Sequence, residues 1–232
     1  MPRQARVIVA NYPHHIIQRG HNRADVFFDD DDYDFYLQNL RTLKYAFDVK
    51  VYAYCLMKNH VHLIINPGDN TSSIGLFMKR LAGRQTRYIN KKYDRSGTLW
   101  ESRYRSSLIE TERYLLACCR YVEMNPVRSK ITKTVLQYKW SSFSERLSSP
   151  VKWIDPCPNF KNFSKNPIHK QKEWSHFINY PAPQAEWDLI TSAINRSQIT
   201  GDKPFIKDIS NLLGLKLPER SRGRPRKIIS NI

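Results

Sequence analysis

Met57-Lys58-Asn59-His60-Val61-His62-Leu63-Ile64-Ile65 is the stretch that decides the fold. Residues 49–56 before it are mostly apolar, and Asn66-Pro67-Gly68 follows it with turn residues, so the pattern predicts the second strand of a β-hairpin. Side chains two apart on a strand share a face, which places His60 and His62 roughly 7 Å apart at Cβ. Two neutral imidazoles can bind one divalent cation, but a third ligand must come from elsewhere.

The composition is that of a basic globular protein. The 232 residues are 41% hydrophobic, enough for one good-sized domain and a small second one. Lys and Arg number 38 against 21 acids, giving a formal charge of +17 and a pI near 9.8. A globular protein this basic usually meets a polyanion, and nucleic acid is the first candidate. A basic protein without a nucleic-acid partner is the alternative.

The cysteines and the hydropathy indicate a cytoplasmic protein. Cys55, Cys118, Cys119 and Cys157 form no Cys-x-x-Cys pair, which argues against a disulfide framework or a thiolate zinc site. No apolar run approaches the ~18 residues of a membrane span. We therefore expect a reduced, cytoplasmic protein with no membrane partner.

The first half of the chain predicts a strand at residues 12–20 and then a helix. Four acids, Asp29 to Asp32, precede the helix and are expected to cap it, because negative charge is favourable at a helix N-terminus; a metal cluster is the alternative. The expected buried face of this helix is Tyr33, Tyr36, Leu37, Leu40, Leu43 and Phe47.

A second helix is predicted from about residue 71 to 93, with a basic stripe on one face. Its spacings of four, three and four residues align four cations, which suit a phosphate backbone or an ordinary solvated helix face. These cations are Arg80, Arg84, Arg87 and Lys91. A further strand is predicted at 103–109, so the chain has the pattern of an α+β fold, an antiparallel sheet flanked by helices.

A third helix is predicted from Tyr114 to about Asn125, closed by Pro126. Tyr114, Cys118, Tyr121 and Asn125 are expected to share one face of it. From residue 148 the pattern loosens into a Pro-, Asn- and Lys-rich stretch. We therefore predict a domain over residues 1–147 and a mostly helical C-terminal extension over 148–232, with helices near 186–194 and 204–213.

These motifs, in this order, resemble a known family. The segments are Arg19-Gly20-His21-Asn22-Arg23, Leu56-Met57-Lys58-Asn59-His60-Val61-His62, Leu99-Trp100-Glu101-Ser102-Arg103-Tyr104, Tyr121-Val122-Glu123-Met124-Asn125-Pro126-Val127 and Tyr138-Lys139-Trp140-Ser141-Ser142. Together they resemble the single-tyrosine HUH transposases of insertion sequences, most closely the REP-associated tyrosine transposases. The resemblance covers roughly residues 5–145 and implies the HUH endonuclease fold, which has a ferredoxin-like or RRM-like core.

The resemblance also implies a reaction. His60, His62 and Asn125 would hold Mg²⁺ or Mn²⁺, and Tyr121 would attack single-stranded, hairpin-containing DNA to give a 5′-phosphotyrosine. A phenol is a poor nucleophile at neutral pH, and a nearby cation favours the phenolate. Expected DNA contacts, beside the basic stripe, are Arg19, His21, Arg23, Arg103 and Arg105. Arg222 and Arg224 resemble an AT-hook, for which a disordered basic tail is the alternative.

Other interpretations of the same residues stay open. A bare His-x-His is more often a pair of sheet histidines, and Tyr114 is a rival nucleophile that lacks the spacing to Asn125. His14 and His15 are expected in the core or at DNA rather than at a cation, and Glu123 is expected to be structural or solvated. The competing functions are a hairpin-binding regulator and a nuclease that uses water. The relatives work as monomers or as homodimers, and the localisation they imply is the bacterial nucleoid.

Overall fold

The computed structural model describes residues 6–147, 153–158 and 166–214. Its elements, in chain order, are β1 (His14–Arg19), η1 (His21–Arg23), α1 (Asp30–Ala46), β2 (Lys50–Met57), β3 (His60–Asn66), α2 (Ser73–Lys92), β4 (Arg105–Leu108), α3 (Thr111–Glu123), α4 (Asn125–Arg128), η2 (Val135–Gln137), α5 (Ser142–Leu147), α6 (Pro167–Asn179), α7 (Gln184–Arg196) and α8 (Lys203–Leu213).

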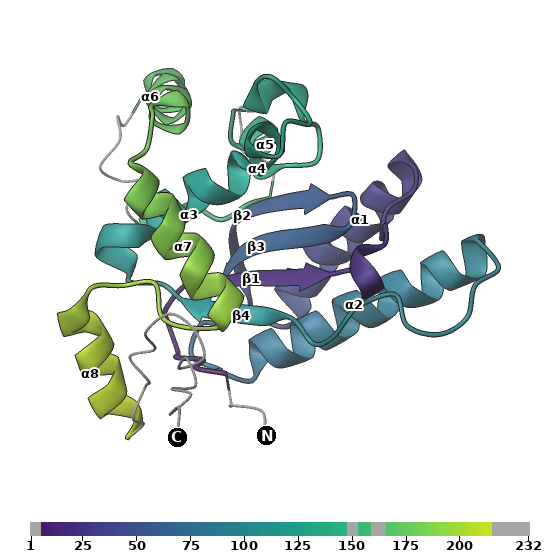
Figure 1. Ribbon diagram of the computed structural model, residues 1–232, viewed down its shortest axis with the longest axis horizontal. Coiled ribbons are helices and arrows are strands. Elements are labelled where there is room, and N and C mark those ends of the chain that lie inside the picture. Colours follow the sequence, from purple (N-terminus) through teal and green to yellow (C-terminus); the bar gives the residue numbers. More distant parts are fainter. Residues whose placement is uncertain (1–5, 148–152, 159–165, 215–232) are drawn as a thin grey trace, which may run out of the picture. The chain divides into compact units, whose positions relative to one another are not determined.

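The sheet has four antiparallel strands in the order β2-β3-β1-β4 (Figure 1). Helix α1 connects the parallel strands β1 and β2, and helix α2 connects the parallel strands β3 and β4. The two connections cross the sheet in opposite directions, and their first strands, β1 and β3, are antiparallel. Because such crossovers are right-handed, both helices fall on the same face. This connectivity and strand order are those of a ferredoxin-like core. The predicted fold class, an antiparallel sheet flanked by helices, is therefore confirmed.

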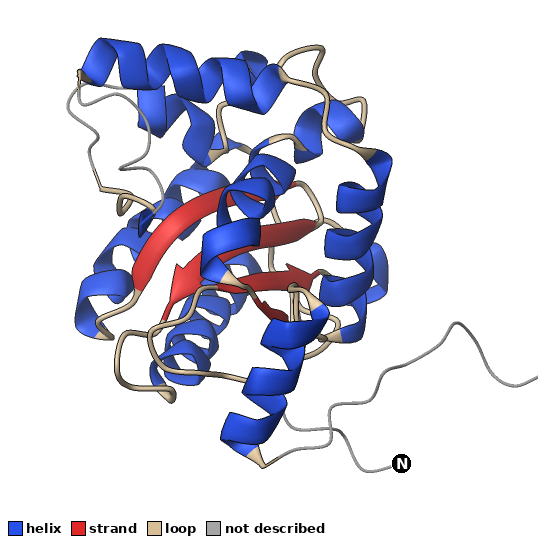
Figure 2. Cartoon of the chain, turned by 90° about the vertical axis from the view of Figure 1, so that its left-hand side faces the viewer, coloured by secondary structure: helices blue, strands red, loops and turns tan. Residues whose placement is uncertain are grey.

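Helices cover the second face as well. There α3 packs on β2 and β3, and α7 packs on β1 and β4, so that Figure 2 shows helices on both sides of the sheet. Every residue of β2 after Lys50 and every residue of β3 after His60 is buried. A strand covered on both sides carries no polar alternation, which explains the nearly unbroken apolar runs in the sequence.

The acidic run caps α1, as predicted. The Asp29 carboxylate accepts from the Asp32 backbone N–H at 3.2 Å, and the Asp32 carboxylate accepts from the backbone N–H of Asp29 at 3.4 Å. Lys92, in the last turn of α2, pairs with both Asp29 and Asp32 at 2.7 and 2.9 Å. The run therefore begins α1 and also joins it to α2.

The third predicted helix ends earlier than expected. Helix α3 stops at Glu123, and Pro126 stands in the first turn of the separate helix α4 instead of closing α3. The prediction was wrong here because proline is tolerated at the start of a helix as well as after its end. Strands β1 and β4 are also shorter than predicted, so that Tyr12 and Arg103 lie outside them.

Among the described residues of the C-terminal part, the sequence did not predict α6 but did predict α7 and α8. The buried carboxylate of Glu123 accepts hydrogen bonds from Arg146 Nε at 3.2 Å, from Ser142 Oγ at 2.6 Å and from Trp174 Nε1 at 2.9 Å. Helix α3 is thus held by α5 and α6. Glu123 is therefore structural, one of the two outcomes expected for it.

The chain divides into two compact units, of which the first extends to Gly201 and the second begins at Asp202. The domain boundary expected at residue 148 remains a prediction. In the second unit, α8 is capped by Asp202, which accepts from the Phe205 N–H, and is followed by Gly214 with φ of 61°. Arg222 and Arg224 lie outside the described residues. None of the described helices has the length and hydropathy to cross a membrane.

Candidate active site

The paired histidines stand at the start of β3, directly after the β2–β3 turn. In the register of the sheet His62 lies beside Ile17 of β1, and His60 lies beside Arg19. The two imidazole rings have centroids 5.0 Å apart and are nearly perpendicular, at 79°. They are side by side, as the alternation of a strand requires.

Tyr121 comes to the same place from α3. Its ring meets His62 edge-on with centroids 5.9 Å apart, and His15 of β1 with centroids 5.5 Å apart. Tyr114, the rival nucleophile, lies two turns earlier on α3, about 10 Å along the helix axis. The structure therefore brings Tyr121 to the histidine pair from a segment some 60 residues away in the chain.

Three further side chains surround Tyr121. Arg128 of α4 lies over the Tyr121 ring at 4.6 Å and over the Trp187 ring of α7, also at 4.6 Å. Thr191 of α7 donates from its hydroxyl to the Tyr121 oxygen at 3.3 Å. With α7 over it, Tyr121 is only 6% exposed. The candidate nucleophile is thus flanked by a guanidinium and covered by a helix.

The histidines of the site are held neutral. Burial, reinforced by the charge of Arg19, lowers the pKa of His60 to about 4. Burial also lowers the pKa of His62 well below its usual value, helped by the neighbouring His60 and His15 rings and by the charge of Arg128. Burial alone lowers the pKa of His15 to about 3. A neutral imidazole is the form that binds a cation, so these shifts suit a metal site.

Asn125 begins α4, and its side chain turns back onto α3. Its amide nitrogen donates to the backbone carbonyls of Tyr121 and Val122, at 3.0 and 3.4 Å. Because a carbonyl can only accept, the nitrogen must face the helix and the amide oxygen faces away from it. An amide oxygen is a suitable ligand for a hard cation. Between α3 and α4 stands Met124, whose backbone has right-handed helical dihedral angles.

The donor set fits a divalent cation only if Asn125 is included. Among the described residues, no group of three His, Cys, Asp or Glu side chains comes together in a metal-binding cluster. His60 and His62 supply two neutral nitrogens, and the outward amide oxygen of Asn125 supplies the chemistry of a third ligand.

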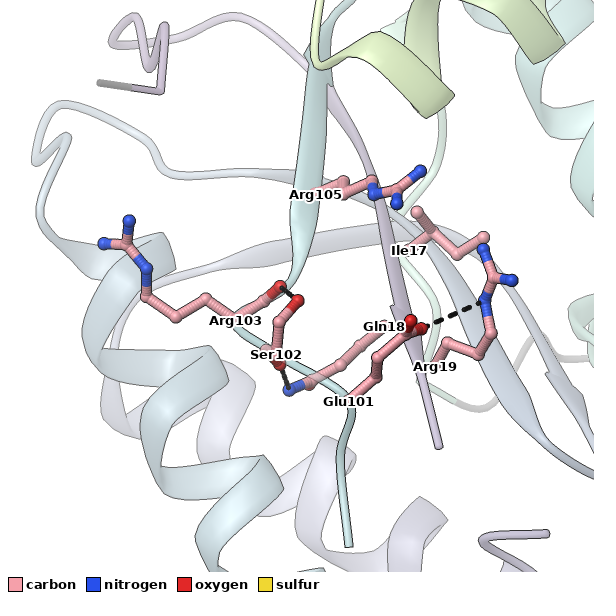
Figure 3. Close-up of a pocket in the computed structure, with 7 residues that line it drawn as sticks. All are labelled: Ile17, Gln18, Arg19, Glu101, Ser102, Arg103 and Arg105. Atoms are coloured by element: carbon pink, nitrogen blue, oxygen red, sulfur yellow. Dashed lines mark hydrogen bonds and ion pairs between the residues drawn. The ribbon is translucent and has the colours of Figure 1, made fainter. Parts of the chain in front are cut away.

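Three of the arginines predicted to contact DNA line one small pocket beside the histidines (Figure 3). Its lining is Ile17, Gln18, Arg19, Glu101, Ser102, Arg103 and Arg105. Arg19 is 3.7 Å from the Glu101 carboxylate, and Arg105 donates to the Asn195 carbonyl of α7 at 3.0 Å. Figure 3 shows Arg103 directed away from the other two arginines. Arg19 and Arg105 share the sheet face of the histidines, since strand partners point the same way.

The other predicted DNA contacts among the described residues do not line this pocket. His21 and Arg23 are exposed in η1. The basic stripe lies on α2, which covers the opposite face of the sheet. Arg80, Arg87 and Lys91 are exposed there, whereas Arg84 is half-buried and donates to Asn39 of α1 at 2.8 Å. The sequence could not distinguish these two groups of cations, because residue spacing does not say which sheet face a helix covers.

Comparisons with known proteins identify the family of the chain. A family model described as "Transposase IS200 like" matches residues 8–125, about half of the chain. The chain therefore belongs to the IS200-like transposase family, and the resemblance stated from the sequence is confirmed.

Two individual proteins are similar to this chain. A protein of Haemophilus influenzae named as a REP-associated tyrosine transposase is 25% identical over 109 residues, which is 43% of this chain and 61% of that protein. The chain thus spans about three fifths of that relative. A solved structure, "Structure of the REP associates tyrosine transposase bound to a REP hairpin", has a TM-score of 0.54 at 16% identity and covers 68% of this chain and 93% of that one. At this identity the similarity shows the fold alone.

Proposed function

We propose that this protein is a metal-dependent, single-strand DNA endonuclease and strand transferase that uses Tyr121 as its nucleophile. The observation that carries the proposal is the contact between the Tyr121 and His62 rings, 5.9 Å apart, within a chain of the IS200-like transposase family. The substrate we propose is hairpin-containing DNA of the REP type. The relative named for a REP hairpin and the positive charge of this chain, +17, support that choice.

In the proposed reaction the Tyr121 oxygen bonds to the phosphorus of one phosphodiester, and the bond from phosphorus to the 3′ oxygen breaks. The phenol loses its proton and the departing 3′ oxygen gains one, so no net proton is consumed. The products are a 5′-phosphotyrosine and a free 3′-hydroxyl. The covalent link keeps the energy of the phosphodiester, and attack by a 3′-hydroxyl in the reverse sense rejoins the strand without ATP.

His60, His62 and Asn125 are the residues that would hold the cation, Mg²⁺ or Mn²⁺. Such an ion supplies positive charge that polarises the scissile phosphate and favours the phenolate. Arg128 is the residue of this chain that we assign to the same electrostatic task, because its guanidinium lies 4.6 Å from the Tyr121 ring centroid. We assign Arg19 and Arg105, which lie on the same sheet face as the histidines, to binding the DNA backbone.

A second candidate function is binding without cleavage. It is favoured by one observation: Tyr121 is only 6% exposed, beneath Thr191 and Trp187 of α7. A regulator that recognises hairpins through its basic surfaces would not need access to that hydroxyl. Cleavage requires the DNA to reach Tyr121, so the two candidates differ in whether a covalent adduct forms.

A denaturing gel of purified protein with 3′-end-labelled hairpin DNA and Mn²⁺ tests the proposal. Wild type should give a slow-migrating protein–DNA band. Tyr121→Phe removes only the nucleophilic oxygen and should abolish the band, whereas Tyr114→Phe, a matched change on the same helix, should leave it. His60→Ala should abolish the band too.

The other outcomes point elsewhere. Cleavage that survives Tyr121→Phe with no covalent band indicates attack by water, and a band lost only with Tyr114→Phe makes Tyr114 the nucleophile. Tight binding with no cleavage of several hairpins supports the regulator.

A further inference from the structure

We propose that Asn59 and His15 are positioning residues: Asn59 fixes the tautomer of His60 with Nε2 unprotonated, and His15 accepts from His62 in the form whose Nε2 can bind a cation. The inference rests on the proposed function for the identity of that ligand. Neither Asn59 nor His15 is needed for the chemistry itself. They stand out because each contacts the Nδ1 atom of one site histidine.

The argument for Asn59 begins at a backbone carbonyl. The Asn59 amide lies between the carbonyl oxygen of Arg23, at 3.0 Å, and Nδ1 of His60, at 2.6 Å. A carbonyl can only accept, so the group that faces Arg23 must be the amide NH₂. The amide oxygen then faces His60, and since that oxygen also only accepts, the proton must be on His60 Nδ1. A neutral ring carries a single N–H, which leaves the Nε2 lone pair free.

The Arg23 carbonyl is itself held in place by the loop that carries it. Gly20 donates its N–H to the Asn59 carbonyl at 2.8 Å, and Val26 donates its N–H to the Lys58 carbonyl at 2.9 Å. Arg23 has a φ of 61°, a left-handed conformation that is uncommon for a residue with a side chain. These two backbone hydrogen bonds hold the loop of residues 20–26 against the β2–β3 turn and so fix the Arg23 carbonyl beside the Asn59 amide.

His15 makes the corresponding contact with His62. His15 Nε2 and His62 Nδ1 are 2.9 Å apart, and both side chains are buried, at 0% and 2% exposure. One proton lies between the two rings. When His62 carries it, His62 Nε2 is free for a cation; when His15 carries it, His62 Nε2 bears the other hydrogen and cannot bind. A bound cation therefore selects the form in which His15 accepts.

The two contacts differ in one respect. Asn59 allows only one tautomer of His60, because the Arg23 carbonyl fixes the orientation of the Asn59 amide. His15 can donate or accept, and its Nδ1 has no hydrogen-bond partner among the described residues. We therefore expect His60 to be a single tautomer without metal, whereas the His15–His62 pair is driven into its binding form by the cation.

The tautomers can be read directly by long-range ¹H–¹⁵N correlation NMR of histidine-labelled, metal-free protein. Wild-type His60 should be the Nδ1–H form. Asn59→Ala removes the acceptor and should populate the Nε2–H form, and Asn59→Asp keeps an acceptor and should keep the wild-type form. Asn90→Ala is the matched control. Asn90, on helix α2, likewise donates from its side-chain amide to a backbone carbonyl, that of Gly97.

The effect of the tautomers on cation affinity is tested by monitoring Mn²⁺ binding with electron paramagnetic resonance. Removing a partner that orients a metal-binding histidine typically weakens binding by roughly 10–100-fold. Asn59→Ala and His15→Leu should each do so, and Asn59→Asp and Asn90→Ala should not. If Asn59→Ala does not fold, Asn59→Asp still tests the assignment, because its carboxylate can only accept from His60.

Two results would overturn the inference: His60 in the Nε2–H form in wild type, or an unchanged tautomer and Mn²⁺ affinity in Asn59→Ala. Failure of the proposed function has a different signature. In that case the NMR and Mn²⁺ results are as expected, but no covalent DNA adduct forms on any hairpin.

Discussion

Arg128 is the residue that we propose to supply positive charge beside Tyr121, in addition to the charge of the metal ion. Its guanidinium lies over the Tyr121 ring, and negative charge passes from the phenolate to the phosphate as the proposed reaction proceeds. A charge fixed beside such a centre contributes most in the transition state. Arg128→Met should therefore slow adduct formation roughly 100-fold at saturating DNA in single-turnover experiments, with Arg128→Lys intermediate.

Arg95→Met is the control for loss of an arginine over an aromatic ring, since Arg95 lies 5.9 Å from the Phe28 ring centroid, beyond the end of α2. It should leave the rate unchanged. A weaker affinity with an unchanged single-turnover rate in Arg128→Met would make Arg128 a DNA contact only.

His14 should make the fold sensitive to acid. It is fully buried in β1, its Nε2 accepts from the Val9 N–H at 3.3 Å, and burial lowers its pKa from 6.5 to about 4. Between pH 6.5 and 4 the unfolded chain takes up a proton at this position and the folded chain does not. The free energy of unfolding therefore falls as the pH is lowered through this window, by up to about 3 kcal/mol from His14.

Urea denaturation of wild type and His14→Gln between pH 7.5 and 4 measures this effect. The variant cannot titrate at this position, so it should lose less stability on acidification than wild type. Equal losses in the two proteins would show that His14 is not responsible.

At the candidate site, some residues could be predicted from the sequence and others could not. His60, His62 and Tyr121 could be nominated because their spacing matches a family motif. Trp187 and Thr191 could not, because a lone tryptophan and threonine in an amphipathic helix carry no sign of the tyrosine they cover. The tautomer of His60 depends on the Arg23 carbonyl, and a backbone atom leaves no trace in a sequence.

At the level of elements, the loop after β1 and the β2–β3 turn form one unit. A Cβ added at Gly20 would lie 2.1 Å from the Ala24 carbonyl oxygen, far inside contact distance. Gly20→Ala should therefore displace the loop, destabilise the protein by roughly 1–3 kcal/mol and weaken Mn²⁺ binding.

The same substitution in α2 should do the opposite. Gly75 has nothing within 4 Å of an added Cβ, so Gly75→Ala should stabilise the protein by roughly 0.5–1 kcal/mol by favouring the helix. Thermal unfolding of both variants provides the comparison. A neutral Gly20→Ala would show that the loop relaxes without disturbing the turn.

Elements with strong local signals were predicted, and those that depend on distant partners were not. The acidic cap of α1 and the hairpin of β2 and β3 could be predicted because the residues that form them are adjacent in the sequence. Helix α6 was missed because it follows a Pro- and Lys-rich stretch and because Trp174 is buried against Glu123, 51 residues earlier. Pro126 was misjudged because the residue alone does not distinguish a helix end from a helix start.

For the molecule as a whole, Tyr121 and His62 of one chain are already in contact, and Glu123 fastens the tyrosine helix to α5 and α6 of that chain. We therefore expect each chain to cleave with its own tyrosine. A mixture of His60→Ala and Tyr121→Phe proteins should form no covalent adduct. Restored adduct formation in the mixture would mean that the tyrosine helix is exchanged between two chains.

The positive charge of the molecule should make DNA binding depend strongly on salt. Each phosphate neutralised on a single strand contributes about 0.7 to the slope of log affinity against log salt. If the stripe on α2 binds DNA, replacing Arg80, Arg87 and Lys91 by Ala should reduce that slope by about 2. Arg19→Ala together with Arg105→Ala gives the corresponding measurement for the histidine face. An unchanged slope in the triple variant would mean that the α2 stripe is only a solvated face.

The cover that α7 places over Tyr121 also has a consequence for the order of events during synthesis. Domains begin to fold from the N-terminus while the ribosome is still adding residues. The strands that carry the histidines emerge first, and the tyrosine follows some 60 residues later. The partners of that tyrosine, Trp187 and Thr191, arrive only after another 66 to 70 residues. A nascent chain therefore passes through a stage in which the histidines and the tyrosine are present but the tyrosine still lacks its cover.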